Sequence, residues 1–201
     1  MEHEVPFVGL TGGMGAGKST ALEALRRLGA AVLSTDAVVH ELYQQPQLRD
    51  AVVERWGAQV APGGQVDRAA VAQRAFASDE DRRWLEGLLW PLVGARVAAW
   101  LAEVRSGHGG APRPRAAVVE IPLLFESGMQ DAYDATIAVV SEESLRHERA
   151  SARAHALVDE RAARQLSQEE KARRATFVVR NDGSREDLER ELSAVLEKLA
   201  S

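Results

Sequence analysis

Eight consecutive residues near the N-terminus combine the residue types that bind a phosphate group. Gly12-Gly13-Met14-Gly15-Ala16-Gly17-Lys18-Ser19 matches the pattern G-x-x-x-x-G-K-[ST]. Glycines let the backbone curl so that successive N–H groups point at a phosphate, and a helix beginning near Lys18 adds the positive end of its dipole. The lysine can reach the β- and γ-phosphates, and the serine hydroxyl can bind Mg²⁺. A glycine-rich turn with a chance lysine would match in under roughly 1% of chains of this length, so we predict a nucleoside triphosphate site.

Two carboxylates follow expected strands. Asp36 comes shortly after the apolar run 31–33, and Glu120 ends the apolar run 116–119. Because ligands gather at the carboxyl ends of parallel strands, both are expected to face the phosphate loop. Asp36 can accept a proton from an attacking hydroxyl or orient it, and Glu120 can act on Mg²⁺ directly or through water. The alternatives are that Asp36 caps the next helix and that Glu120 is a polar end to a buried strand.

Arginines are concentrated between residues 145 and 174. Arg146, Arg149 and Arg153 lie three and four residues apart, so on a helix they share one face. Arginines stabilise the negative charge that spreads over a phosphoryl group during transfer, and a charge-dense helical pair is typical of a mobile lid. A solvated helix surface is the alternative. That alternative is the better interpretation for four others, Arg161, Arg164, Arg173 and Arg174.

The elements that must position these residues are those of an α/β fold. Apolar runs at 7–10, 31–33, 116–119, 135–140 and 176–179 predict five strands, and helical periodicity at 19–28 links the first two as a βαβ unit with a parallel sheet. Residues 36–105 are expected to be mostly helical. Asp67 can cap one helix there, and a longer one is expected from about Asp79, interrupted near Pro91. Residues 106–115 have neither pattern and predict a loop.

Composition excludes several classes of protein. The chain has 201 residues and a formal net charge of −5, which disfavours a protein that coats nucleic acid. The absence of cysteine excludes disulfides and thiolate chemistry and fits a reducing cytoplasm. Because no unbroken run of 18 apolar residues occurs, we expect no membrane-spanning segment and a cytoplasmic protein. The oligomeric state, monomer or small homo-oligomer, stays open.

Taken in order, these residues resemble the dephospho-CoA kinase family along nearly the whole chain. Residues 9–20 look like the family's opening, including its Thr-Gly-Gly lead-in and Thr20. Val66-Asp67-Arg68 and residues 85–93 resemble its helical CoA-side domain, and residues 122–126, Pro-Leu-Leu-Phe-Glu, are similar to its most distinctive internal motif. Residues 145–165 look like its lid, and residues 178–183 resemble the strand and turn near the adenine.

The resemblance implies a P-loop three-layer sandwich with a parallel five-stranded sheet, a helical insertion and a helical lid. Residues 1–35, 106–144 and 175–201 would form the nucleotide-binding core, 36–105 the CoA-substrate domain and 145–174 the lid. The implied reaction transfers the γ-phosphate of Mg-ATP to the ribose 3′-hydroxyl of dephospho-CoA, giving CoA and ADP. The resemblance implies that Asp36 orients or deprotonates the hydroxyl. It also implies that phosphate is held by Lys18, Arg149 and Arg153, and Mg²⁺ by Ser19 and Glu120. The ATP-binding residues would be 12–20 together with Asn181.

The chain departs from the family pattern at four positions. Glu120 stands where the family usually has Asp, Trp90 replaces a His before Pro91, Ala154 replaces an acid, and Arg180 replaces an Asp. Other functions stay open beside the family reading. Another small-molecule P-loop kinase would lack the 122–126 motif, and a nucleotide-dependent switch would usually carry the Asn-Lys-x-Asp guanine reader that this chain does not have. The presence of Lys18, Ser19 and Asp36 argues against a binding module that lacks catalytic activity.

Overall fold

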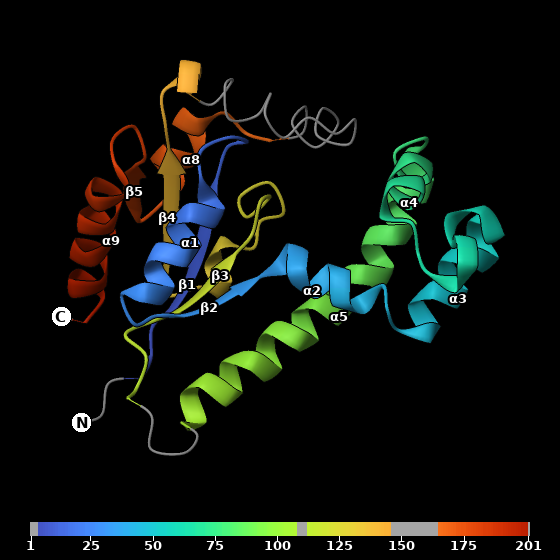
Figure 1. Cartoon of the computed structure of the whole chain (residues 1–201), viewed down its shortest axis with the longest axis horizontal. Helices are drawn as coiled ribbons and strands as arrows, with labels where there is room; N and C mark the ends of the chain where they lie inside the picture. The colour runs from blue at the N-terminus through green and yellow to red at the C-terminus, as the bar shows by residue number, and fades with distance from the viewer. Residues whose placement is uncertain (1–3, 108–111, 146–164, 201) are drawn as a thin grey trace.

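A five-stranded parallel sheet forms the centre of the chain. The structure is a computed structural model that describes residues 4–107, 112–145 and 165–200. The strand order is β2-β3-β1-β4-β5, and every neighbouring pair is parallel (Figure 1). The five strands are β1 (Phe7–Gly12), β2 (Ala31–Ser34), β3 (Ala117–Glu120), β4 (Ala135–Val140) and β5 (Phe177–Arg180). The predicted parallel sheet is confirmed, with the order reversing direction at β1, where ligands are expected to bind.

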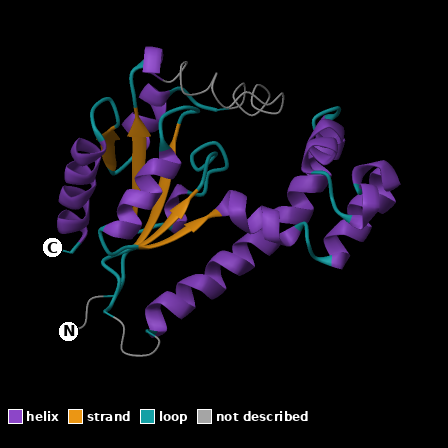
Figure 2. Ribbon diagram, viewed as in Figure 1, coloured by secondary structure: helices purple, strands orange, loops and turns teal. Residues whose placement is uncertain are grey.

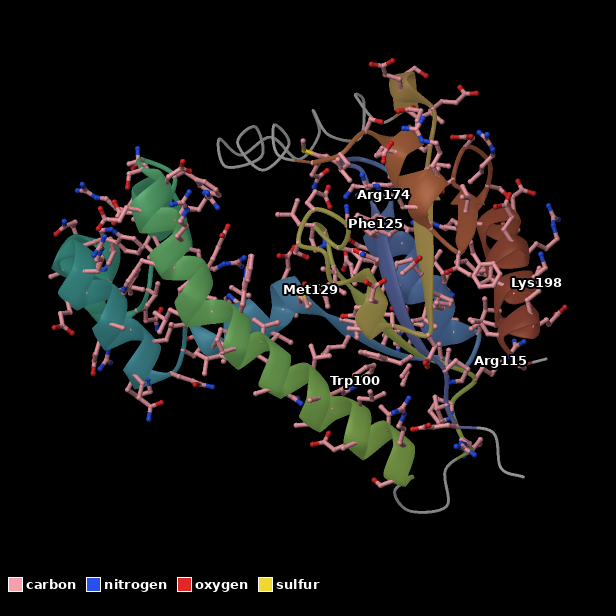
Figure 3. The ribbon with its side chains drawn as sticks, turned by 180° about the vertical axis from the view of Figure 1, so that it is seen from behind. Trp100, Arg115, Phe125, Met129, Arg174 and Lys198 are labelled. Atoms are coloured by element: carbon pink, nitrogen blue, oxygen red, sulfur yellow. The ribbon has the colours of Figure 1, made fainter. Side chains whose placement is uncertain are left out.

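Helices cover both faces of the sheet, which confirms the predicted three layers. On one face, α1 (Lys18–Arg27) and α9 (Arg185–Leu199) pack their apolar sides against β1 and β4. A capping box between Ser184 and Asp187 fixes the start of α9. On the other face, the segment after β3 packs in a separate apolar cluster that includes Phe125 and Trp100, together with residues that flank α8 (Gln168–Arg174). Figure 3 views the molecule from the side opposite to Figure 1 and labels Phe125 and Trp100.

The chain between β2 and β3 forms a helical region that extends away from the sheet (Figure 2). Its core is its own cluster of apolar side chains, so the expected insertion is present. Asp67 caps α4 (Arg68–Ala75) by accepting hydrogen bonds from two backbone N–H groups, as its sequence position predicted. The elements are α2 (Thr35–Leu42), α3 (Pro46–Trp56), η1 (Ala58–Val60), η2 (Pro62–Gly64), α4 (Arg68–Ala75) and α5 (Asp79–Ser106). A further 3₁₀ turn, η3 (Gln130–Ala132), precedes β4.

The four tryptophans do not share one environment. Trp56 and Trp84 pack edge to face in the helical region with ring centroids 5.0 Å apart. Trp100 packs beside the sheet. Trp90, by contrast, is 54% exposed on α5. Core packing therefore accounts for three of the tryptophans and does not account for Trp90.

The expected interruption of the long helix at Pro91 was wrong. Helix α5 runs unbroken through Pro91. Proline removes one backbone hydrogen bond, but packing on both sides of it holds the helix: Leu89 is buried in the helical region, and Val97 packs beside the sheet. By length and composition α5 is also apolar enough to cross a membrane, with 6% of its apolar window buried. That is weak evidence for such a segment, because a helix of a globular fold can meet the same criteria.

Candidate active site

The phosphate loop joins β1 to α1 at the point where the strand order reverses. Gly15 and Gly17 adopt positive φ angles of 74° and 90°, a conformation that glycine reaches without steric cost. Gly17 is the N-cap of α1 and makes no side-chain hydrogen bond to the first turn. The first N–H groups of the helix and its dipole therefore face the loop, which is the arrangement that binds phosphate.

Two glycines allow close contacts that fix the shape of the loop. A Cβ atom on Gly12 would lie 2.5 Å from the carbonyl oxygen of Val139 on β4. A Cβ atom on Gly17 would overlap the side-chain amide of Asn181. That amide nitrogen donates a hydrogen bond of 2.9 Å to the carbonyl oxygen of Ala16. Asn181, expected on the adenine side, is thus buried against the loop and supports its backbone directly.

Lys18 lies over the loop that precedes it. Its Nζ atom donates hydrogen bonds of 3.1 Å to the carbonyl oxygens of Gly12 and Gly13. Ser19 follows in the first turn of α1 and is exposed. The charge of Lys18 also acts on Glu120, whose carboxyl pKa it lowers. The lysine therefore lies between the loop and the carboxylate side of the site.

Glu120 and Asp36 meet at the carboxyl ends of β3 and β2, as predicted. Glu120 pairs in register with Leu10 on one side and Ser34 on the other, and it is 7% exposed. Burial raises the pKa of the Glu120 carboxyl, the charge of Lys18 and a hydrogen bond from Ser34 lower it, and the charge of Asp36 raises it further. The two carboxylates therefore share one electrostatic environment with Lys18.

Asp36 is exposed and lies in the first turn of α2, where an acid interacts favourably with the helix dipole. The alternative that Asp36 caps α2 is wrong, because the helix begins at Thr35 and its N-cap residue is Ser34. The hydroxyl of Thr35 instead bonds the carbonyl oxygen of Glu120, at 2.9 Å. The carboxylate of Asp36 therefore stands at the site edge without a capping role.

A cavity of about 610 Å³ opens beside the loop, lined by Gly13 and Met14 and by the ends of β4 and β5. The start of α8 forms its opposite side, and the side chain of Gln168 pairs there with both the N–H and the carbonyl of Ser141, at 2.8 and 2.9 Å. This pairing joins the two chain segments that flank residues 146–164. Five arginines of the predicted lid segment lie outside the described residues: Arg146, Arg149 and Arg153, for which a role was predicted, and Arg161 and Arg164.

Comparison with known proteins identifies the family of the chain. The family model described as dephospho-CoA kinase matches residues 6–187. The chain belongs to the dephospho-CoA kinase family. A Deinococcus radiodurans protein named dephospho-CoA kinase is 40% identical over 197 residues, covering 96% of this chain and 91% of that protein. A crystal structure from Thermus thermophilus is 33% identical with a TM-score of 0.72, covering 99% of this chain and all of the other.

More distant structures share the fold alone. A shikimate kinase from Bacteroides thetaiotaomicron is 14% identical with a TM-score of 0.53, and the match covers 99% of this chain and all of that one. The three-layer fold with a parallel five-stranded sheet that the sequence predicted is confirmed by the strand topology and by these structures. The resemblance to the dephospho-CoA kinase family is confirmed by the family match.

The sequence did not predict Ser34 as a site residue, and it did not predict how Asn181 supports the loop. Ser34 reaches Glu120 because β2 and β3 are neighbours, and Asn181 reaches Ala16 from the turn after β5. Ser34 carried a usable signal, since it ends an expected strand beside the strand of Glu120. The contact of Asn181 had no comparable local signal, because the two residues are 165 positions apart.

Proposed function

We propose that this protein transfers the γ-phosphate of ATP to the ribose 3′-hydroxyl of dephospho-CoA, giving CoA and ADP in the last step of CoA biosynthesis. The observation that carries the proposal is the meeting of an intact phosphate loop with two carboxylates, Asp36 and Glu120, at one edge of the sheet in a chain of this family. The loop accounts for ATP, and the family accounts for the acceptor.

The roles of the loop follow from its geometry. The N–H groups of residues 13–19 and the first turn of α1 bind the β- and γ-phosphates. The ammonium of Lys18 exchanges its carbonyl partners on the loop for phosphate oxygens. Gly12 and Thr20 are the two ends of the proposed ATP-binding segment, residues 12–20. Asn181 supports the backbone of this segment through its hydrogen bond to Ala16.

Asp36 is the proposed base or orienting group. Its carboxylate accepts the proton of the 3′-hydroxyl as the hydroxyl oxygen bonds to the γ-phosphorus and the bond from that phosphorus to the β–γ bridging oxygen breaks. ADP leaves with the electron pair of that bond. Arg149 and Arg153 are proposed to neutralise the equatorial oxygens from the lid, residues 145–174.

Mg²⁺ fits the donors that the site offers. Within residues 4–107, 112–145 and 165–200, no group of three or more His, Cys, Asp or Glu side chains is arranged to hold a metal ion alone. Mg²⁺ commonly uses one or two carboxylates together with phosphate oxygens and water, so Ser19 and Glu120 are a suitable protein contribution. When bound, the ion would neutralise charge on the β- and γ-phosphates.

The helical region, residues 36–105, is proposed to hold the CoA part of the acceptor, facing the nucleotide-binding core formed by 1–35, 106–144 and 175–201. The exposed Trp90 offers an apolar surface for the pantetheine arm or the adenine of that substrate. We also propose that the enzyme works in the cytoplasm, as a monomer or small homo-oligomer, without nucleic acid or membrane partners.

An ADP-release assay with purified protein and Mg-ATP tests the function. Dephospho-CoA, AMP, shikimate and pantetheine are compared as acceptors, with a reaction that lacks any acceptor as the background. Turnover is expected with dephospho-CoA and not with the other three. Turnover with another acceptor and none with dephospho-CoA would show a P-loop kinase of different specificity and refute the proposal.

A further inference from the structure

Lys171, in α8, is a cation whose side chain has no exposed surface (0%). It is the largest of the fully buried side chains in the described part of the protein. Burial lowers the pKa of its ammonium group, and the carboxylate of Glu126 opposes that effect. Because an apolar side chain of similar length would fill this space without the cost of desolvating a charge, packing alone does not explain a lysine here.

Three oxygen atoms surround the ammonium group. Its Nζ atom lies 2.7 Å from the carbonyl oxygen of Pro122, 2.9 Å from Oε1 of Glu126 and 3.4 Å from Oγ1 of Thr11. A lysine ammonium has three N–H donors, so these contacts use all of them. The same Oε1 atom of Glu126 accepts a 2.8 Å hydrogen bond from the backbone N–H of Leu166. The lysine thus joins α8 to the end of β1 and to the turn after β3.

These contacts lie where β1 and β3 stop pairing through their backbones. The register between the two strands ends with Leu10 and Glu120, and the N–H of Ile121 then bonds the carbonyl of Leu10 at 2.8 Å. One residue further, the Thr11 hydroxyl donates to the Pro122 carbonyl at 3.3 Å. Lys171 contacts both of these residues. Side chains therefore continue the connection between the strands after the ladder has ended.

We propose that Lys171 is a positioning residue for phosphoryl transfer, an inference that rests on the function proposed above. Thr11 immediately precedes Gly12, the first glycine of the phosphate loop, and Pro122 lies two residues after Glu120. By holding Thr11 and Pro122 together, the ammonium group fixes the loop relative to the metal-side carboxylate. A shift of about 1 Å in such a relation is enough to reduce a rate about 100-fold.

The test must separate positioning from stability. Lys171→Met alone leaves the carboxylate of Glu126 buried without its cation and is expected to lower the melting temperature strongly. The double variant Lys171→Met/Glu126→Leu replaces the whole pair by apolar side chains, and its melting temperature is expected to return to within about 4 °C of wild type. An exposed pair between α1 and α9, replaced as Arg27→Met/Glu189→Leu, is the matched control and is expected to leave kcat unchanged.

Positioning predicts that the double variant keeps a kcat about 10- to 100-fold below wild type although its stability has returned. The KM for dephospho-CoA is expected to stay within about twofold, because the hydrogen bonds and ion pair that Lys171 and Glu126 make among the described residues all go to Thr11, Pro122, Leu166 or each other, and none goes to residues 36–105. A double variant of wild-type stability whose kcat falls less than about fivefold overturns the proposal. If that variant does not fold, Thr11→Val decides: a kcat loss of about threefold or more supports positioning, and a smaller loss overturns it.

An error in the proposed function can be distinguished from an error in the proposed role of Lys171. If wild-type protein phosphorylates another acceptor and not dephospho-CoA, the substrate assignment fails, and the same variants are compared with the acceptor that is used. If no acceptor is phosphorylated, the dissociation constant of Mg-ATP, measured by calorimetry, replaces kcat. An increase of about threefold or more in the stable double variant then supports positioning, and a smaller change overturns it.

Discussion

The Gly17→Ala substitution is expected to weaken Mg-ATP binding strongly while leaving the protein folded. Gly17 has a φ of 90°, and a Cβ atom there would overlap the amide of Asn181. Either the loop or Asn181 must move, and the 2.9 Å hydrogen bond to the carbonyl of Ala16 is lost in both cases. The N–H groups that face the phosphate shift with the loop. Binding therefore suffers more than folding does.

The expected magnitudes follow from these contacts. An alanine held at positive φ costs about 1–2 kcal/mol, and loss of one hydrogen bond adds about 1 kcal/mol, so the free energy of unfolding is expected to fall by about 2–3 kcal/mol. A misplaced N–H that no longer bonds a charged phosphate costs about 1.5–3 kcal/mol, which corresponds to about a 10- to 100-fold weaker Mg-ATP affinity. Urea unfolding measures the first quantity, and calorimetry measures the second.

Two further variants isolate the cause. Gly63 also has a positive φ, of 66°, but a Cβ atom there would meet nothing within 4 Å. Gly63→Ala is therefore expected to show the backbone cost of about 1–2 kcal/mol with unchanged Mg-ATP affinity. In an Asn181→Ala background the overlap is absent, so Gly17→Ala should cost only what Gly63→Ala costs. Unchanged Mg-ATP affinity in Gly17→Ala, or an equal stability cost in both backgrounds, would refute this reasoning.

Three more predictions concern the carboxylates and the helical region. Asp36→Asn is expected to lower kcat about 10²- to 10⁴-fold with little change in Mg-ATP affinity, and a retained kcat would exclude it as the base. For Glu120 the folded-state pKa is raised, so its ionisation opposes folding: stability is lost as pH rises from the unfolded pKa through the folded pKa, and the cost persists at neutral pH. Glu120→Gln is therefore expected to unfold at a higher urea concentration than wild type at pH 7, and the difference is expected to vanish at acidic pH. Its kcat is expected to fall about 10²-fold. If the variant and wild type were equally stable at both pH values, the burial effect would be contradicted. Asp67→Ala removes the cap of α4 and is expected to cost about 1 kcal/mol in urea unfolding without changing kcat, so an activity loss there would mean that the cap also shapes the acceptor site.

The parts of the fold that local patterns encode were predictable from sequence. Each predicted strand overlaps an observed one, because a buried parallel strand is a short apolar run between turn residues. The cap at Asp67 was also local. Pro91 misled because its local cost was outweighed by the packing of α5 on both sides, which no local pattern reports. Asp36 was correctly assigned to the carboxyl-end edge of the sheet. The alternative that it caps α2 was wrong because the helix begins at Thr35, two residues earlier than a cap at Asp36 would require.

The supporting contacts of the site were not predictable because they depend on the order of the strands. Ser34 meets Glu120 only if β2 lies beside β3, and Lys171 meets Thr11 and Pro122 only if α8 returns over the ends of β1 and β3. The sequence pattern gives a parallel sheet, and several strand orders are compatible with it. The residues proposed to bind phosphate could be read from the motif, whereas the residues that contact the motif from elsewhere in the chain depend on the topology.

The electrostatics of the site explain why such support is needed. Burial already opposes the charge of Glu120, and the nearby charge of Asp36 opposes it further. Lys18 opposes both effects, and the same ammonium donates hydrogen bonds to the carbonyls of Gly12 and Gly13; in the proposed function it would bind the phosphates as well. Because like charges repel, the two carboxylates favour a larger separation. The Ser34 contact, the hydrogen bond from the Thr35 hydroxyl and the contacts of the buried Lys171 connect these strand ends. In the proposed function, such support keeps the carboxylates at the spacing that Mg-ATP and the acceptor would require.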